Sequence, residues 1–315
     1  MLRLQATAAD PAPAEHGEGP VWDGAELLWV DITAGLVRRG SVSADGAVTE
    51  RAAHRGGDTV GVVVTAAAGG WLLGAGAGFT HLTADGEARV LVELAGEGGS
   101  AETGGTRMND GACDRAGRFY AGTMAFDERP GAGALYRLDT DGTVGTVLDG
   151  LTVSNGLDWS PDDRTVYLSD SGDAVVWAFD YDLATGEFGP RQEFLRVDGS
   201  DGVPDGLTVD DEGCVWTAMW GGGAVRRWSP DGELLAVVDV PAENTSSCCF
   251  AGPGRDVLVV STSRQGLDDA ARGAQPDAGR LFTARPGVAG PVAFPYRGPV
   301  TDVHQVRTLG TPGAG

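Results

Sequence analysis

The stretch DGLTVDDEGCVWTAMWGGGAVRRWSPDG, residues 205–232, contains the pattern that decides the fold. A short apolar run is followed by an acidic turn, a second apolar run around Trp216, a glycine-rich connection and a third run that ends at an Asp-Gly pair. Runs of strand-forming residues divided by turn residues predict a β-meander. A 3.6-residue apolar period, the mark of an amphipathic helix, is almost absent.

The same pattern occurs six times along the chain. When the units are aligned, their equivalent points are separated by roughly 42 to 49 residues, the period expected of four-stranded propeller blades. Those points are Trp29, Trp71, Tyr120, Tyr167, Trp216 and Leu258. Six equal β units close more simply into a ring than into a solenoid, which needs capping units. The sequence therefore predicts an all-β, six-bladed β-propeller.

The repeat also predicts how the chain is divided. We expect residues 1–300 to form a single propeller domain and residues 301–315, which are rich in glycine, to be a flexible C-terminal tail. Two segments are candidates for completing the last blade, residues 2–6 at the N-terminus and residues 292–296 near the C-terminus.

Composition excludes several partners. The formal net charge of −22 would repel nucleic acid and anionic membranes. No apolar stretch is long enough to cross a bilayer and no leader-like segment precedes the first unit, so we expect a cytoplasmic protein, either a monomer or a small homo-oligomer. The four cysteines lack the spacing of a zinc finger and are expected to be buried free thiols.

Polar residues recur where the chain enters the first strand of a unit. They are Glu18, Asn109 with Asp110, Asn155 and Asp205. In a propeller these positions converge on the central channel. Asn-Gly and Asp-Gly pairs also form turns, but recurrence at one phase together with Glu18, which is not a turn residue, favours a shared site. Carboxylate and amide oxygens suit Ca²⁺, Mg²⁺ or Mn²⁺ better than a soft-ligand metal, with Zn²⁺ as an alternative.

Arg107 stands two residues before Asn109, so both side chains lie on the same side of a strand. A single arginine is usually paired with a surface acid. At this position, however, its guanidinium can hold substrate hydroxyl or carbonyl oxygens.

Several motifs in order resemble those of the senescence marker protein, gluconolactonase and regucalcin family, over nearly the whole chain. They are GEGPVW at residues 17–22, RMNDG at 107–111, SNGLDW at 154–159, PDG at 204–206 and SCCF at 247–250. The resemblance implies a six-bladed propeller with one divalent metal ion in its channel. It implies that Glu18, Asn155 and Asp205 are the metal ligands, and that Arg107 and Asn109 contact the substrate.

One position departs from the family pattern. After Gly-Thr-Met-Ala the best-known members carry two acidic residues, the second of which touches substrate, whereas Phe126 and Asp127 follow here. We expect Asp127 to be the substrate contact, with a different preference for ring size or hydroxyl pattern.

The function that the resemblance implies is metal-dependent hydrolysis of a sugar lactone, such as gluconolactone, to its aldonic acid. Ca²⁺ is the preferred ion, with Zn²⁺, Mg²⁺ and Mn²⁺ as alternatives, and Asp205 is the candidate general base for the attacking water. Alternatives are a phosphotriester or other ester hydrolase and a non-catalytic calcium-binding regulatory protein. Arg107 with Asn109 favours an enzyme, because an ion buffer has no need of a substrate clamp.

Overall fold

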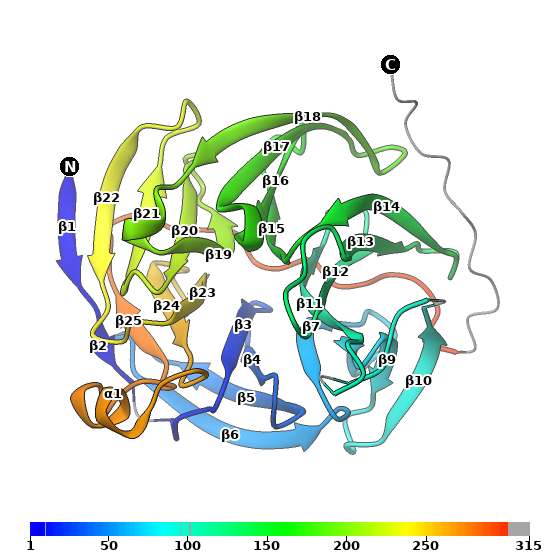
Figure 1. Cartoon of the computed structure of the whole chain (residues 1–315), viewed down its shortest axis with the longest axis horizontal. Coiled ribbons are helices and arrows are strands. Elements are labelled where there is room, and N and C mark those ends of the chain that lie inside the picture. Colours follow the sequence, from blue (N-terminus) through cyan, green and yellow to red (C-terminus); the bar gives the residue numbers. More distant parts are fainter. Residues whose placement is uncertain (10, 95, 101, 302–315) are drawn as a thin grey trace.

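The computed structural model describes residues 1–9, 11–94, 96–100 and 102–301. Six β-sheets are arranged as a ring around a central channel (Figure 1). The predicted all-β, six-bladed propeller is therefore confirmed.

Each blade contains an antiparallel meander of three or four strands whose first strand lies innermost. The first two blades are β3 (Gly17–Trp22), β4 (Leu27–Asp31), β5 (Leu36–Val42) and β6 (Val48–Arg55), then β7 (Val60–Thr65), β8 (Trp71–Ala75), β9 (Gly78–Leu82) and β10 (Ala88–Glu93). The next two are β11 (Thr106–Cys113), β12 (Phe119–Ala125), β13 (Gly133–Leu138) and β14 (Val144–Leu151), then β15 (Ser154–Trp159), β16 (Thr165–Asp170), β17 (Val175–Asp182) and β18 (Glu187–Arg196). The last two are β19 (Val203–Val209), β20 (Val215–Trp220), β21 (Ala224–Trp228) and β22 (Leu234–Asp239), then β23 (Thr245–Ala251), β24 (Val257–Thr262), β25 (Phe282–Ala284) and the N-terminal β2 (Thr7–Ala8).

The six equivalent residues found in the sequence all lie on the second strand of a blade, and all are buried. Apolar side chains from both faces of each sheet pack against the neighbouring blade, so six core clusters alternate with the six blades. Burial on both faces explains why the second strands of the blades are almost continuously buried, whereas an outer strand such as β6 alternates between exposed residues and residues that are buried or half-buried. Among the described residues, helix is confined to two short 3₁₀ turns, Ser171–Asp173 and Gly199–Asp201, and to α1 (Asp269–Ala274).

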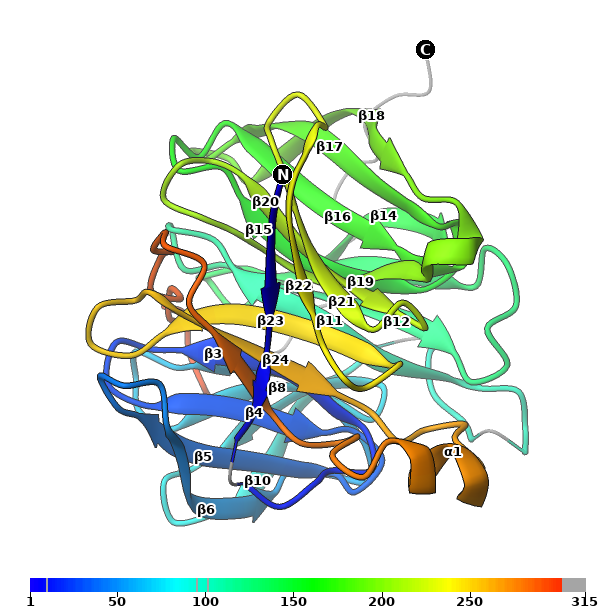
Figure 2. The same ribbon diagram turned by 90° about the vertical axis from the view of Figure 1, so that its left-hand side faces the viewer.

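The N-terminal segment closes the ring, although not with the residues predicted. Thr7 and Ala8 of β2 pair with Thr283 and Phe282 of β25 and supply the outer strand of the sixth blade. The preceding strand β1 (Leu2–Gln5) instead adds to the fifth blade, parallel to β22 (Figure 2). Since β2 has only two residues, it is too short to show an alternating pattern in the sequence.

Residues 292–296 do not complete the last blade. They belong to a segment, residues 285–301, that we name the base strap. Residues 291–294 of the strap line a cavity together with the last residues of the innermost strands. The amide of Ala293 donates to Trp22 of the first blade, that of Tyr296 to Thr65 of the second and that of Arg297 to Gly117 of the third. Pro291 and Pro295 have no amide hydrogen, which disfavours a ladder strand at this position.

The predicted tail begins where the description ends. Residues 302–315 lie outside the described residues, so the division at residue 300 stays a prediction. Within the described part of the chain, no helix has the length and apolar character that a bilayer crossing requires.

Candidate functional site

The polar residues singled out in the sequence lie on the innermost strands, each at an interruption of the ladder. Pairing shifts register between Glu18 and Val21, between Met108 and Gly111, between Ser154 and Leu157, and between Pro204 and Leu207. Such bulges bend a strand and redirect its side chains. Four blades therefore project a polar side chain into the channel at the same level.

The glycines that follow two of these residues are needed for close packing rather than for turns. A Cβ atom on Gly156 would lie 2.2 Å from the amide nitrogen of Leu207, and one on Gly206 would lie 2.1 Å from Oγ of Ser247. Both glycines lie inside strands, β15 and β19. The turn interpretation of Asn155-Gly156 and Asp205-Gly206 is thus excluded.

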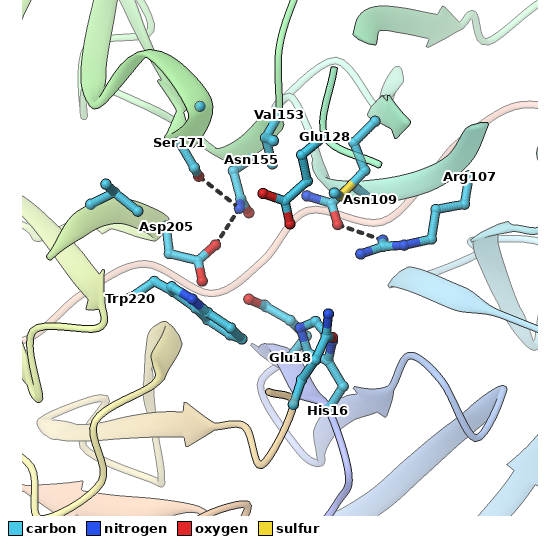
Figure 3. A pocket seen from close by; sticks show the side chains of 14 residues that line it. His16, Glu18, Arg107, Asn109, Glu128, Val153, Asn155, Ser171, Asp205 and Trp220 are labelled. Atoms are coloured by element: carbon cyan, nitrogen blue, oxygen red, sulfur yellow. Dashed lines mark hydrogen bonds between the residues drawn. The ribbon is translucent and has the colours of Figure 1, made fainter. Parts of the chain in front are cut away.

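These side chains meet in a pocket of about 110 Å³ at one end of the channel (Figure 3). It is lined by His16, Glu18, Arg107, Asn109, Met124, Glu128, Val153, Asn155, Ser171, Gly172, Val203, Asp205, Trp220 and Gln265. All five residues predicted for the metal and the substrate clamp are among them, and all five are at most 7% exposed.

Negative charge is concentrated at the bottom of the pocket. Burial, with the neighbouring Asp205 and Asp110 carboxylates, raises the pKa of Glu18 well above its usual range. Burial and Asp110 likewise raise the pKa of Asp205, and burial raises that of Asp110 to about 6. Three carboxylates that are desolvated by burial and repel one another form the electrostatic setting that a bound cation relieves.

Asn155 provides an independent test of whether a metal ion fits. Its amide nitrogen donates to Oδ1 of Asp205 and, over 3.0 Å, to Oγ of Ser171. Its carbonyl oxygen Oδ1 is buried and has no hydrogen-bond partner among the described residues. A buried carbonyl oxygen without a partner is costly. Beside two carboxylates it completes an oxygen donor set of the kind that Ca²⁺, Mg²⁺ and Mn²⁺ prefer. The residues present therefore fit a divalent ion.

Arg107 is held in place by Asn109. Its Nη1 donates to Oδ1 of Asn109 over 2.7 Å and to the carbonyl of Met108 over 3.0 Å. Asn109 in turn donates from Nδ2 to the carbonyl of Ser154 over 2.9 Å. Burial lowers the pKa of Arg107 to about 10, so the guanidinium is still protonated at neutral pH. A fixed cation thus faces the carboxylates across the pocket.

The structure does not bring Asp127 to the pocket. Its side chain is 54% exposed and pairs with Arg129 over 2.8 Å. The next residue, Glu128, lines the pocket in its place and attracts the charge of Arg107. Glu128 has a φ of 53°, which is unusual for a residue with a side chain and turns the chain so that this carboxylate faces inward. This turn could not be predicted from the sequence, because Asp127 and Glu128 follow the same motif.

One side of the pocket is formed by two aromatic rings that were not predicted from the sequence. The ring centroids of His16 and Trp220 are 5.5 Å apart, and both residues line the pocket beside Glu18 (Figure 3). Burial and the charge of Arg107 lower the pKa of His16 to about 3, so its imidazole is neutral. Trp220 is the last residue of β20 and follows five buried residues. Its position at the end of a buried strand is the only signal in the sequence that could have identified it.

A second group of possible ligands lies elsewhere. Asp210, Glu212 and Cys214 bring their ligand atoms within 4.8 Å of one another. The Asp210 carboxylate already accepts hydrogen bonds from Trp216, from the amide of Cys214 and from Arg227, which also pairs with Glu212. Arginine thus supplies the positive charge here. The four cysteines are free and buried, as predicted.

Comparisons with known proteins agree with the motifs. Residues 16–264 match the model of the SMP-30/Gluconolactonase/LRE-like region. Regucalcin of Danio rerio is 38% identical over 291 residues, which cover 90% of this chain and 95% of that protein. Human regucalcin is 35% identical over 308 residues, covering 95% and 100% of the two chains.

Solved structures show the same architecture. Regucalcin from Agrobacterium tumefaciens, described as a calcium-binding protein, superposes with a TM-score of 0.83 at 28% identity, covering 94% of this chain and 99% of that one. A gluconolactonase from Xanthomonas campestris has a TM-score of 0.67 at 24% identity over 89% and 97% of the chains, a likeness that concerns the fold.

Proposed function

Because the chain belongs to the SMP-30/gluconolactonase/LRE-like family, we propose that it is a lactonase that hydrolyses a sugar lactone to its aldonic acid with the help of one divalent metal ion. One observation carries the proposal. Two buried carboxylates, an unpartnered amide oxygen and a fixed guanidinium converge on one pocket. The carboxylates and the amide suit a cation, while the guanidinium suits an oxygen-rich substrate.

Glu18, Asn155 and Asp205 would hold the ion through their side-chain oxygens. When bound, a divalent ion supplies a Lewis acid that polarises the lactone carbonyl and stabilises negative charge on its oxygen. Ca²⁺ is the ion we prefer, because all three ligands are oxygens.

Asp205 is the proposed general base. Water attacks the carbonyl carbon, and the Asp205 carboxylate takes its proton as the new C–O bond forms. The same group returns the proton to the ring oxygen as the ring C–O bond breaks. Asn155 donates a hydrogen bond to Oδ1 of Asp205, which orients this carboxylate in the pocket.

Arg107 and Asn109 would orient the substrate. Two hydrogen bonds fix Nη1 of Arg107, which leaves its other N–H groups to hold lactone hydroxyl or carbonyl oxygens. Asn109 sets the direction of the guanidinium and can accept a further hydrogen bond through Oδ1. Glu128, at the rim of the pocket, is the proposed substrate contact in place of Asp127, which was the residue expected from the sequence.

The test is acid release from glucono-, galactono-, xylono- and arabinonolactone by metal-stripped protein, with Ca²⁺, Mg²⁺, Mn²⁺ or Zn²⁺ added back. We expect turnover of at least one lactone that depends on the added ion and disappears with chelator. Absence of turnover across the whole panel would contradict the proposal.

A second candidate is a calcium-binding protein without turnover, which the description of the Agrobacterium tumefaciens relative favours. It predicts that Ca²⁺ raises the melting temperature while lactones neither react nor add to the shift. The enzymatic proposal predicts that a lactone adds to the shift only when metal is present.

A further inference from the structure

A groove of about 640 Å³ adjoins the pocket at the second and third blades. Arg107 and Thr106 line it at the start of β11, and Thr59 lines it in front of β7. Arg107 also lines the central pocket. The two cavities therefore lie next to each other, and the Arg107 side chain lines both.

The groove is open because its floor has almost no side chains. The β8–β9 hairpin contributes Ala75, Gly76, Ala77 and Gly78. Gly76 has a φ of +54°, and a Cβ atom added to it would meet nothing within 4 Å. A turn residue with a side chain at this position would project that side chain into the groove, whereas Gly76 leaves the space empty.

The lining is chemically mixed. Phe126, half-buried, lines the groove, as do the apolar side chains Val90 and Leu94. The hydroxyls of Thr59 and Ser100 and the carboxylates of Asp58, Glu93 and Glu97 stand among them. Among the described residues that line the groove, Arg107 is the only cation.

This mixture discriminates between ligand classes. An alkyl chain needs a continuous apolar lining, which the carboxylates and hydroxyls interrupt. An anionic group would be repelled by the carboxylates of Glu93 and Glu97, whereas Asp58 is already paired with Arg55. A neutral sugar matches both features, because its hydroxyls donate to carboxylates and its C–H face packs on an aromatic ring.

We propose that the groove binds a second sugar attached to the lactone, so that the preferred substrate is a glycosyl-substituted aldonolactone rather than a single sugar ring. The lactone ring would occupy the central pocket, and the attached sugar would pass over Arg107 to Phe126. This inference rests on the proposed function for the position of the lactone ring, but the groove can be tested without turnover.

The experiment uses three neutral ligands: gluconolactam and its 4-O- and 6-O-glucosyl derivatives. A lactam has an amide in place of the lactone ester and therefore resists hydrolysis. Their binding to Ca²⁺-loaded protein is measured by calorimetry, beside hydrolysis of the corresponding lactones. We expect at least one glucosyl derivative to bind roughly tenfold or more tightly than gluconolactam, since about 1.4 kcal/mol corresponds to tenfold in affinity.

Ala77→Trp, which fills the groove, should abolish this advantage and leave gluconolactam binding within about twofold. Phe126→Ala should reduce the advantage. Ala44→Trp, at an exposed turn of the first blade, is the matched control and should change neither. Equal binding of all three lactams to the unaltered protein, or a glucosyl preference that survives Ala77→Trp, would overturn the inference. If the glucosyl lactam binds better but no lactone is hydrolysed, the groove assignment stands and the lactonase proposal fails.

Discussion

Replacing Asp110 by asparagine should stabilise the metal-free protein at neutral pH and have no effect in acid. Burial raises the pKa of Asp110 to about 6 from an ordinary value of 3.8. Between these values the folded state binds more protons than the unfolded chain, so stability falls as pH rises through this window. The loss is complete above about pH 6. Two pKa units at 1.36 kcal/mol each give about 3 kcal/mol as the upper bound on the unfolding free energy that the substitution restores.

The expected gain can be converted into a melting temperature. An unfolding entropy of ~2.1 cal/mol/K per residue over roughly 300 residues is about 0.6 kcal/mol/K, so about 3 kcal/mol corresponds to a rise of roughly 5 °C. Asparagine can keep the hydrogen bond from the amide of Gly111 to Oδ1. The steric change is therefore small.

The assay is thermal unfolding with chelator at pH 7.5 and at pH 3.5, with the exposed Asp231→Asn as control. We expect the gain at pH 7.5 only. A variant that is destabilised equally at both pH values would show that Asp110 contributes through its contacts and that the electrostatic reasoning is wrong.

Three further predictions concern the site and the base strap. Asp205→Asn should lower kcat by ~10²- to 10⁴-fold at saturating metal, the usual contribution of a general base, and near-normal kcat would refute that role. Arg107→Gln should lower kcat/KM by ~10- to 150-fold, mainly through KM, because hydrogen bonds from a charged group contribute ~1.5–3 kcal/mol; a pure kcat effect would contradict a binding role. Tyr296 is fully buried and donates from its hydroxyl to the carbonyl of Asp139 over 3.0 Å. Tyr296→Phe should therefore cost ~1 kcal/mol in denaturant unfolding and Tyr296→Ala ~3–5 kcal/mol, whereas equal effects would show that the ring contributes nothing.

The blade repeat could be predicted from the sequence because burial imposes the same pattern six times. Trp29 and its equivalents mark the second strand of each blade, and that register in turn placed Glu18, Asn155 and Asp205 at one level of the channel. A residue fixed by the repeat is therefore predictable in position, even though no single Asn-Gly or Asp-Gly pair is informative.

Features outside the repeat could not be predicted in the same way. Glu128 faces the pocket because one residue adopts a left-handed conformation, and either of two neighbouring acids could have done so. The base strap has no period at all, and Tyr296 is held by the cores of other blades. His16 and Trp220 become neighbours only when the first and fifth blades come together around the ring.

The pairing of β2 with β25 has a consequence for synthesis of the chain. Thr7 is made 276 residues before its partner Thr283. At about 5–20 residues per second, a ribosome needs roughly 15–60 s to reach that partner. During this interval the first blade presents the apolar face that later packs on the sixth, including Trp22 and Trp29. The nascent chain cannot bury this face until β25 has left the ribosome, so the ring closes only after all six blades have been synthesised.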